Sequence, residues 1–254
     1  MREAPPDPMR LAQANMRQPA IRRFYKAVEV GEAEGGDFVL TLDGRKARTP
    51  GRHALASPSP ALMAVVATEW ERQGETLDPA DMPVTRLLNS AIDGVSRTMD
   101  ETRAEIARYA GSDLLCYRAE TPEALVRRQG LAFDPVLDWA EDALGARFNL
   151  AAGVVHVAQP PEAIGAVRAA VDAVDDPAAL AALSVIATLT GSALLALAVQ
   201  RGFLTAAGAW AAAHVDEDFQ NEQWGVDAEA AARRAARWRD MEAAAMVLAA
   251  TRTV

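Results

Sequence analysis

One segment of this chain carries no charged side chain over 23 residues, from Ala178 to Gln200. That length is sufficient to cross a bilayer as a helix, so the segment must either enter a membrane or be buried within the protein. Alanine dominates the segment and Ser, Thr and Gly interrupt it, which makes it a weaker membrane-inserting sequence than a run of Leu, Ile and Phe. The pair Gly191-Ser192 is a natural boundary between two helices. We therefore predict a buried helical hairpin and no stable membrane insertion.

The rest of the composition supports a globular protein with a core of small aliphatic side chains. Of the 254 residues, 50% are hydrophobic and 24% are charged, but only 6% are aromatic. A core rich in alanine favours closely packed helices, because alanine is the best helix former. The net charge of −9 argues against a general nucleic-acid-binding protein, whose binding surface is normally basic. The single cysteine, Cys116, excludes an internal disulfide.

The first clear elements of secondary structure are strands. Residues Phe24–Val30 and Asp37–Leu42 alternate between apolar and polar side chains, which is typical of half-buried strands. Asp43-Gly44 then gives the strongest two-residue signal for a hairpin, and Arg45–Thr49 would be the returning strand. We expect a three-stranded antiparallel meander over residues 22–58. A helix over Pro60–Gln73, capped by Ser59, would cover its apolar face.

The remainder of the chain is predicted to be helical, which gives an α+β fold class. Pro and Asp residues between Asp78 and Pro83 mark a linker. We therefore expect a flexible N-terminal arm at 1–21, a small α+β domain at 22–80 and a larger all-helical domain at 81–254. Within the latter we predict helices at 85–111, 122–129, 134–144, 161–174, 205–224 and 227–248, and a short extended piece at 154–157.

A search for catalytic, cofactor and metal sites finds little. No glycine-rich phosphate loop or dinucleotide fingerprint is present. Cys116 lies in an apolar stretch without a nearby base, so we interpret it as a core residue. His214 and Glu217 share a helix face, but a metal would need further ligands. We expect His53 to be exposed and His156 to be a core residue. The sequence thus indicates no catalytic residue, no metal and no cofactor.

Four carboxylates cluster within seven residues, at Asp216, Glu217, Asp218 and Glu222. They could form a solvated helix face, a surface that recognises Arg or Lys on a partner, or a carboxylate pair for acid–base catalysis. Three aromatic residues, Trp210, Phe219 and Trp224, lie around this cluster and suit either an interface or a core. A basic stripe, Arg233, Arg234, Arg237 and Arg239, could pair with the acids within the fold.

The order of several sequence blocks resembles one protein family over most of the chain. In the first half the blocks are RFYK, LDGRKARTP, ALMAVVATEWERQ and DMPVTRLLNSAID. In the second half they are SDLLCYRAETPEALVRRQ, FDPVLDW, TGSALLALA and DEDFQNEQWGVDAEA. From about Arg22 to the C-terminus, this set is similar to the assembly-factor family for F-type ATP synthase.

The resemblance implies a non-enzymatic, ATP-independent chaperone. Such a protein would bind the free α subunit of F-type ATP synthase, shield its aggregation-prone interface and hand it to the β subunit. The resemblance assigns a functional role to Glu217 and, more weakly, to Asp216, Phe219, Gln220 and Trp224. Two alternatives are a stable adaptor subunit of a larger complex and an enzyme that uses the carboxylates at 216–222.

Two further expectations concern the cellular location and the oligomeric state of the protein. The N-terminal sequence is a poor transit peptide, because Glu3, Asp7 and several prolines interrupt its arginines. This favours a bacterial cytoplasm over a mitochondrial matrix, which would be the location in a eukaryote. We also expect the free protein to be monomeric.

Overall fold

The computed structural model describes residues 21–33, 35–153 and 155–252, and it begins with an antiparallel sheet. Strands β1 (Val28–Glu32) and β2 (Phe38–Leu42) pair along their full length. The hairpin after β2 uses Asp43 and Gly44, with φ of 48° and 75°, as the predicted two-residue turn requires. The first strand was predicted to begin at Phe24 but begins at Val28. The backbone N–H groups of Lys26 and Ala27 donate to the Asp43 carboxylate and not to a neighbouring strand.

The predicted returning strand at 45–49 is shorter in the structure, and a further short strand that we did not predict follows it. Strand β3 (Arg45–Lys46) pairs with one half of β2 and β4 (Ala56–Ser57) pairs with the other. The chain leaves the sheet between them in a loop over residues 48–54. The sheet therefore has four strands instead of three, because the loop returns the chain to β2, where β4 pairs.

Helix α2 (Pro60–Glu71) covers the sheet, as predicted. Ser59 caps it by accepting a hydrogen bond from the Leu62 N–H at 3.1 Å, and Pro60 occupies its first turn. Leu62, Met63 and Val66 are fully buried on the face that α2 presents to the core. The α+β fold class is confirmed.

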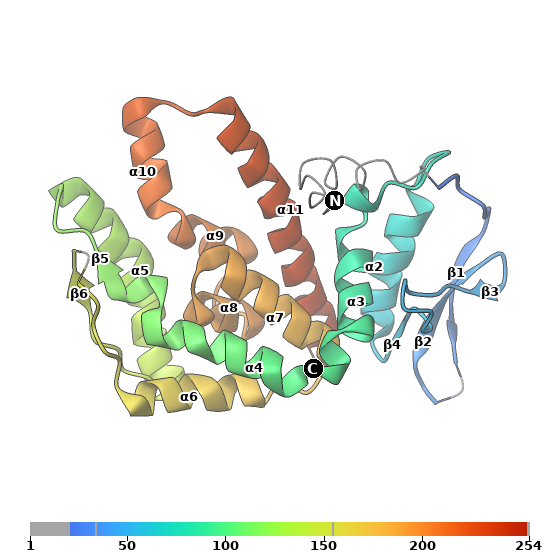
Figure 1. The fold of residues 1–254 in the computed structure, drawn as a ribbon, viewed down its shortest axis with the longest axis horizontal. Helices are drawn as coiled ribbons and strands as arrows, with labels where there is room; N and C mark the ends of the chain where they lie inside the picture. Colours follow the sequence, from blue (N-terminus) through green and yellow to red (C-terminus); the bar gives the residue numbers. More distant parts are fainter. Residues whose placement is uncertain (1–20, 34, 154, 253–254) are drawn as a thin grey trace, which may run out of the picture.

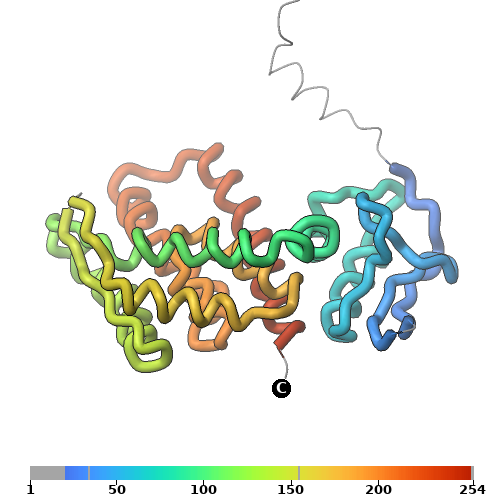
Figure 2. Tube along the Cα trace, turned by 60° about the horizontal axis from the view of Figure 1, so that its bottom comes forward, coloured from blue at the N-terminus to red at the C-terminus, as the bar shows by residue number. Residues whose placement is uncertain are grey.

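The helical part extends away from the sheet in Figure 1, and the two parts are distinct in Figure 2. Helix α7 lies at its centre and packs against α3, α4, α8 and α11. Its other described elements are short 3-10 turns and a two-stranded parallel sheet, β5 (Tyr117–Arg118) and β6 (Ala151–Ala152). The helices are α3 (Pro83–Asp93), α4 (Met99–Arg108), α5 (Glu123–Leu144), α6 (Pro161–Asp172), α7 (Pro177–Thr190), α8 (Ala193–Gln200), α9 (Ala206–Ala213), α10 (Val215–Trp224) and α11 (Ala228–Thr251).

The uncharged segment forms the predicted buried hairpin from α7 and α8. Gly191 ends α7 in the left-handed region at φ 67°, and the Ser192 side chain caps α8 by accepting from the Leu195 N–H. The residues Ala193–Val199 are all buried. No helix among the described residues is both long and apolar enough to span a bilayer.

Several predicted helix boundaries are wrong. Helix α5 is continuous through Pro135, where we predicted two helices. A proline removes one main-chain hydrogen bond, but Phe133 and Val136 are buried on either side of it and keep the helix packed. Conversely, the predicted helix at 85–111 ends at Gly94 before α4 begins, and the one at 205–224 is broken at His214 between α9 and α10.

The segment around His156 also differs from its prediction. The described part of the predicted extended piece, 155–157, belongs to no strand. The His156 side chain is exposed rather than in the core, and its Nδ1 lies 3.2 Å from the Tyr117 hydroxyl. Cys116, by contrast, is buried as predicted, and burial, together with the nearby Asp113 carboxylate, raises the pKa of its thiol to about 12.

Polar contacts join the sheet and α2 to the helical part. The Glu69 carboxylate of α2 accepts from the N–H groups of Val84 and Thr85 at 2.8 and 2.7 Å, at the start of α3. One hydrophobic core runs from Tyr25 to Leu248 across both parts. Of the predicted arm at 1–21, residues 1–20 lie outside the described residues, and a division into domains near residue 80 stays a proposal.

Candidate protein-binding site

Helix α10 carries the acidic block that the sequence singled out. His214 begins the helix and Gly225 ends it with φ 86°. Asp216, Glu217 and Asp218 lie in its first turn, where the partial positive charge of a helix N-terminus stabilises carboxylates. Helix α10 packs against α5 on one side. In Figure 1, α11 diverges from α10 after a short turn, so that the two helices form an open arch.

Two of the predicted site residues contact α5. The Asp216 carboxylate accepts a hydrogen bond of 2.7 Å from the Gln129 side chain, which is buried. The Phe219 ring lies beneath the Arg128 guanidinium, whose central carbon is 5.2 Å from the ring centroid. Both side chains therefore help to hold α10 against α5. Gln220 is exposed.

Two further carboxylates of α10 are paired with arginines. Glu222 accepts two hydrogen bonds from Arg128, at 2.8 and 2.7 Å. These bonds hold the pKa of the Glu222 carboxyl below its usual range. Asp218 forms an ion pair with Arg234 of α11. The charges of both carboxylates are thus largely compensated within the fold.

Glu217 has the weakest partners of the four. Its carboxylate lies 3.8 Å from Arg234 Nη1 and 4.0 Å from His214 Nε2, and 45% of its side chain is exposed. Those distances exceed hydrogen-bond length. His214 is itself buried, and that burial lowers its pKa and favours the neutral imidazole. The Glu217 carboxylate is therefore available to a cation from outside the chain.

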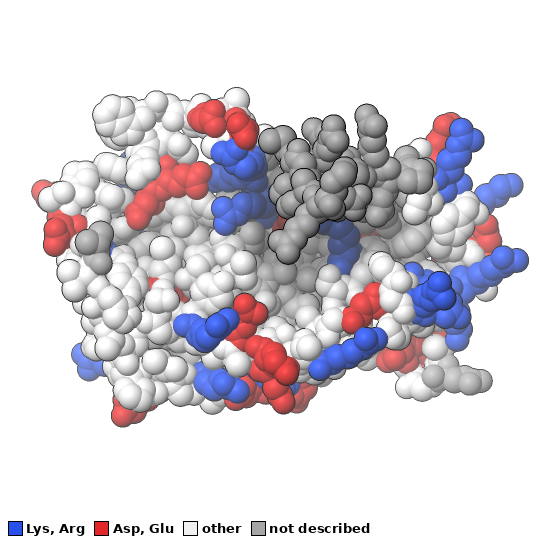
Figure 3. Space-filling model, in the orientation of Figure 1, with Lys and Arg blue, Asp and Glu red and all other residues white. Residues whose placement is uncertain are grey.

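A groove of about 650 Å³ separates α10 from the first half of α11. Its base includes Trp210 and Trp238, whose rings meet edge to face with centroids 5.4 Å apart. Trp224 lies at the end of α10 and is 88% exposed, and Val226 in the following turn is 66% exposed. In Figure 3, acidic side chains over α10 lie next to basic side chains over α11. The lining residues are Trp210, Glu217, Asp218, Asn221, Glu222, Val226, Ala230, Ala231, Arg234, Ala235 and Trp238.

An exposed tryptophan beside an apolar groove and an available carboxylate is typical of a protein-binding surface. Comparison with known proteins agrees with a protein-binding role.

Residues 22–141 match the family model described as ATP12 chaperone protein. The crystal structure of Atp12 from Paracoccus denitrificans is 42% identical, with a TM-score of 0.85, and the match covers 91% of this chain and 99% of that one. The chain belongs to the ATP12 chaperone family.

A second solved structure extends this result over nearly the whole chain. The Atu1473 protein of Agrobacterium tumefaciens is 50% identical, with a TM-score of 0.89, and the match covers 98% of this chain and 93% of that protein. Membership of the ATP12 family confirms the resemblance found in the sequence. It supports a chaperone role in ATP synthase assembly.

The predicted site residues of this ATP12-family chain do not form one continuous surface. Glu217 and Trp224 face solvent or the groove, whereas Asp216 and Phe219 contact α5. Of the basic stripe, only Arg234 is paired with the acids of α10 among the described residues. No group of metal-ligating side chains occurs within 21–33, 35–153 and 155–252.

Sequence analysis missed the α11 side of the groove. Ala231 and Ala235 line it and are exposed, and Trp238 forms part of its base. The spacing of Ala231, Ala235 and Trp238 by four and three residues is a signal that could have revealed this face, because residues at such spacings share one side of a helix.

Proposed function

We propose that this protein binds the free α subunit of F-type ATP synthase and holds it, without ATP hydrolysis, until the β subunit takes its place. The observation that carries the proposal is the combination on α10 of an 88% exposed Trp224 with a half-exposed Glu217 carboxylate. Large aromatic side chains supply much of the binding energy of protein interfaces, and charges at the rim steer the encounter.

The physical purpose of such a holder follows from the client. A subunit that normally pairs with a neighbour exposes apolar surface when it is alone, and such surface aggregates. A cover of ordinary size would bury about 1,600 Å². Its affinity has to be moderate, since the β subunit must displace it. We place the activity in a bacterial cytoplasm.

The contacts of the acidic residues count against the enzyme alternative. An acid–base pair needs one carboxyl whose pKa is raised towards neutrality. Here Glu222 has a lowered pKa because Arg128 donates to it, and Asp218 is paired with Arg234. Co-purification distinguishes the adaptor alternative from a chaperone. An adaptor would co-purify with mature ATP synthase, and a chaperone would not.

The proposal is tested by light scattering of purified ATP synthase α subunit with increasing amounts of this protein and no nucleotide. We expect scattering to be suppressed near a one-to-one ratio and the client to be released on addition of β subunit. Unchanged scattering at a several-fold excess would contradict the proposal. Suppression without release by β subunit would favour the adaptor.

A charge reversal at Glu217 tests the site. In Glu217→Lys, the new cation lies beside Arg234 and repels the basic group that we expect on the client. We predict at least a tenfold loss in affinity for the α subunit, measured by titration calorimetry, with an unchanged circular dichroism spectrum. The control Glu105→Lys makes the same change on α4, where the side chain is 61% exposed, and it should bind normally. Equal binding by both variants would remove Glu217 from the site.

A further inference from the structure

We propose that the groove between α10 and α11 receives an amphipathic helix of the client, with aliphatic side chains against α11 and a basic side chain against Glu217. This inference rests on the proposed function and names the structural element that the groove binds. It extends the site from α10, to which the acidic sequence block pointed, to the first half of α11.

The first argument is the shape of the α11 wall. Ala230, Ala231 and Ala235 line the groove there, and their short side chains allow another backbone to approach closely. Trp210 and Trp238 close the base with edge-to-face rings. A wall of alanines over a base of indoles is complementary to Leu, Ile or Val side chains projecting from a helix.

The second argument is that the first half of α11, before Met241, packs against little of the rest of the protein. Buried residues of α11 begin only at Met241, although the helix starts at Ala228. Among the described residues, the ion pairs that cross from α11 to α10 all involve Arg234. The other α11 residues that line the groove are apolar, with Ala231 and Ala235 exposed and Ala230 and Trp238 half-buried. Burying their exposed area in a complex is favourable by roughly 25 cal/mol per Å².

Charge identifies the occupant further. The groove lining contains three carboxylates, Glu217, Asp218 and Glu222, but one guanidinium, Arg234. Arg128 of α5 compensates Glu222 from outside the lining, and Arg234 compensates Asp218. One negative charge, on Glu217, is therefore left for the occupant. An Arg or Lys on the incoming segment would supply the opposite charge and fix its register.

Secondary structure decides between a helix and an extended segment. Both walls of the groove are helices, whose backbone groups are already paired within each helix, so an incoming strand would find no edge to pair with. A helix satisfies its own backbone and can pack its ridges against α10 and α11. The groove thus fits a third helix that completes a three-helix arrangement.

The test fills the groove without changing its charge. Ala235→Trp places an indole in the groove, whereas Ala236→Trp places it about 100° further around α11, outside the groove lining, where residue 236 is exposed. We expect Ala235→Trp to weaken binding of the α subunit at least tenfold in titration calorimetry, and Ala236→Trp to bind like the unmodified protein. Circular dichroism and thermal unfolding of both variants establish that each is folded.

A photo-crosslinking amino acid at position 231 identifies the occupant independently of these variants. Mass spectrometry should find the crosslink on a helical segment of the α subunit that carries Arg or Lys. Crosslinks to a second copy of this chain, to an extended segment of the client or to no segment would overturn the inference. So would normal binding by Ala235→Trp. If the unmodified protein does not suppress α-subunit aggregation, the proposed function itself fails.

Discussion

At the scale of single residues, the most unusual group is the carboxyl of Asp113. Its side chain is fully buried, and it accepts from the N–H groups of Leu115 and Leu194 at 3.2 and 3.1 Å. It therefore ties the segment before β5 to the start of α8. Burial raises its pKa to about 6, although hydrogen bonds from Ser192 and from backbone N–H groups oppose the shift.

This shift makes stability depend on pH. A carboxyl whose folded pKa is about 6, against an ordinary value of 3.8, stabilises the fold most at pH below 3.8 and loses that contribution as pH rises through 6. We predict that the free energy of unfolding, relative to Asp113→Asn, falls by roughly 2–3 kcal/mol between pH 4 and pH 7, at about 1.4 kcal/mol per pKa unit. Urea titrations of both proteins measure it, and parallel pH profiles would contradict the shift.

Individual residues also show what the sequence could and could not predict about the site. The resemblance singled out Glu217, but the acidic block alone could not tell it from Asp218 and Glu222, whose carboxylates are paired with arginines. The roles of Asp216 and Phe219 were not, because their partners lie on α5, with Gln129 87 positions from Asp216 in the sequence. Only the tertiary packing of α10 on α5 shows that these two side chains hold the helix in place.

At the scale of elements, local backbone signals correctly predicted where several strands and helices begin or end. Asp43-Gly44, Ser59 and Gly191-Ser192 act through their own turn or cap geometry, and each marks the boundary that was expected. Errors arose where packing outweighs a local preference. Helix α5 continues through Pro135. The strand predicted at 45–49 ends at Lys46, and the unpredicted strand β4 follows the loop at 48–54.

Two glycine-to-alanine substitutions that should change the free energy of unfolding in opposite directions test this reasoning. Gly191 has a φ of 67° and open space on the side where a Cβ would lie, so Gly191→Ala is opposed by backbone strain alone. We expect it to lower the free energy of unfolding by about 1 kcal/mol. Gly165 lies within α6, also with open space, so Gly165→Ala should raise it by up to about 1 kcal/mol. Chemical denaturation measures both, and the same sign for both would contradict the assigned geometry.

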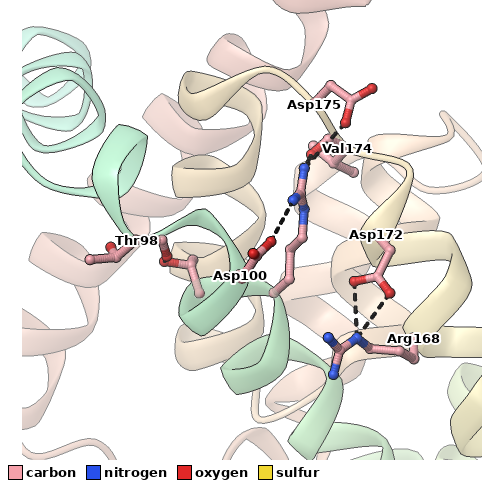
Figure 4. Close-up of polar contacts among 8 residues, drawn as sticks. Thr98, Asp100, Arg168, Asp172, Val174 and Asp175 are labelled. Atoms are coloured by element: carbon pink, nitrogen blue, oxygen red, sulfur yellow. Dashed lines mark hydrogen bonds and ion pairs between the residues drawn. The ribbon is translucent and has the colours of Figure 1, made fainter.

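At the scale of the whole molecule, polar contacts between elements help to fix the helices relative to one another. Arg103 of α4 donates to the Val174 carbonyl at 2.9 Å and to the carboxylates of Asp100 and Asp175 at 3.0 and 3.2 Å. Figure 4 shows these three groups converging on one guanidinium. The contact ties α4 to the turn between α6 and α7, and α7 in turn packs along α11.

Hydrogen bonds at both ends of α3 join the sheet to the helical part. Glu69 accepts from the first N–H groups of α3, as described above. At the other end, Asp93 accepts from the Thr49 hydroxyl at 2.6 Å, the Gly51 N–H at 2.8 Å and His53 Nδ1 at 2.8 Å. Burial alone would raise the pKa of Asp93, but these hydrogen bonds outweigh it and lower the pKa. The loop at 48–54 is thus held to α3.

We therefore predict that the two proposed domains unfold as one unit and that Asp93 contributes to the stability of both. Asp93→Ala leaves three donors without their acceptor and should cost about 2 kcal/mol. The control Asp172→Ala removes a surface pair with Arg168, which lies 2.9 Å away and is drawn in Figure 4, and should cost less than about 0.5 kcal/mol. Hydrogen exchange should show the amides of β2 and α7 losing protection equally in Asp93→Ala. Loss confined to β2 would mean that the sheet opens alone and that α3 does not couple the two parts.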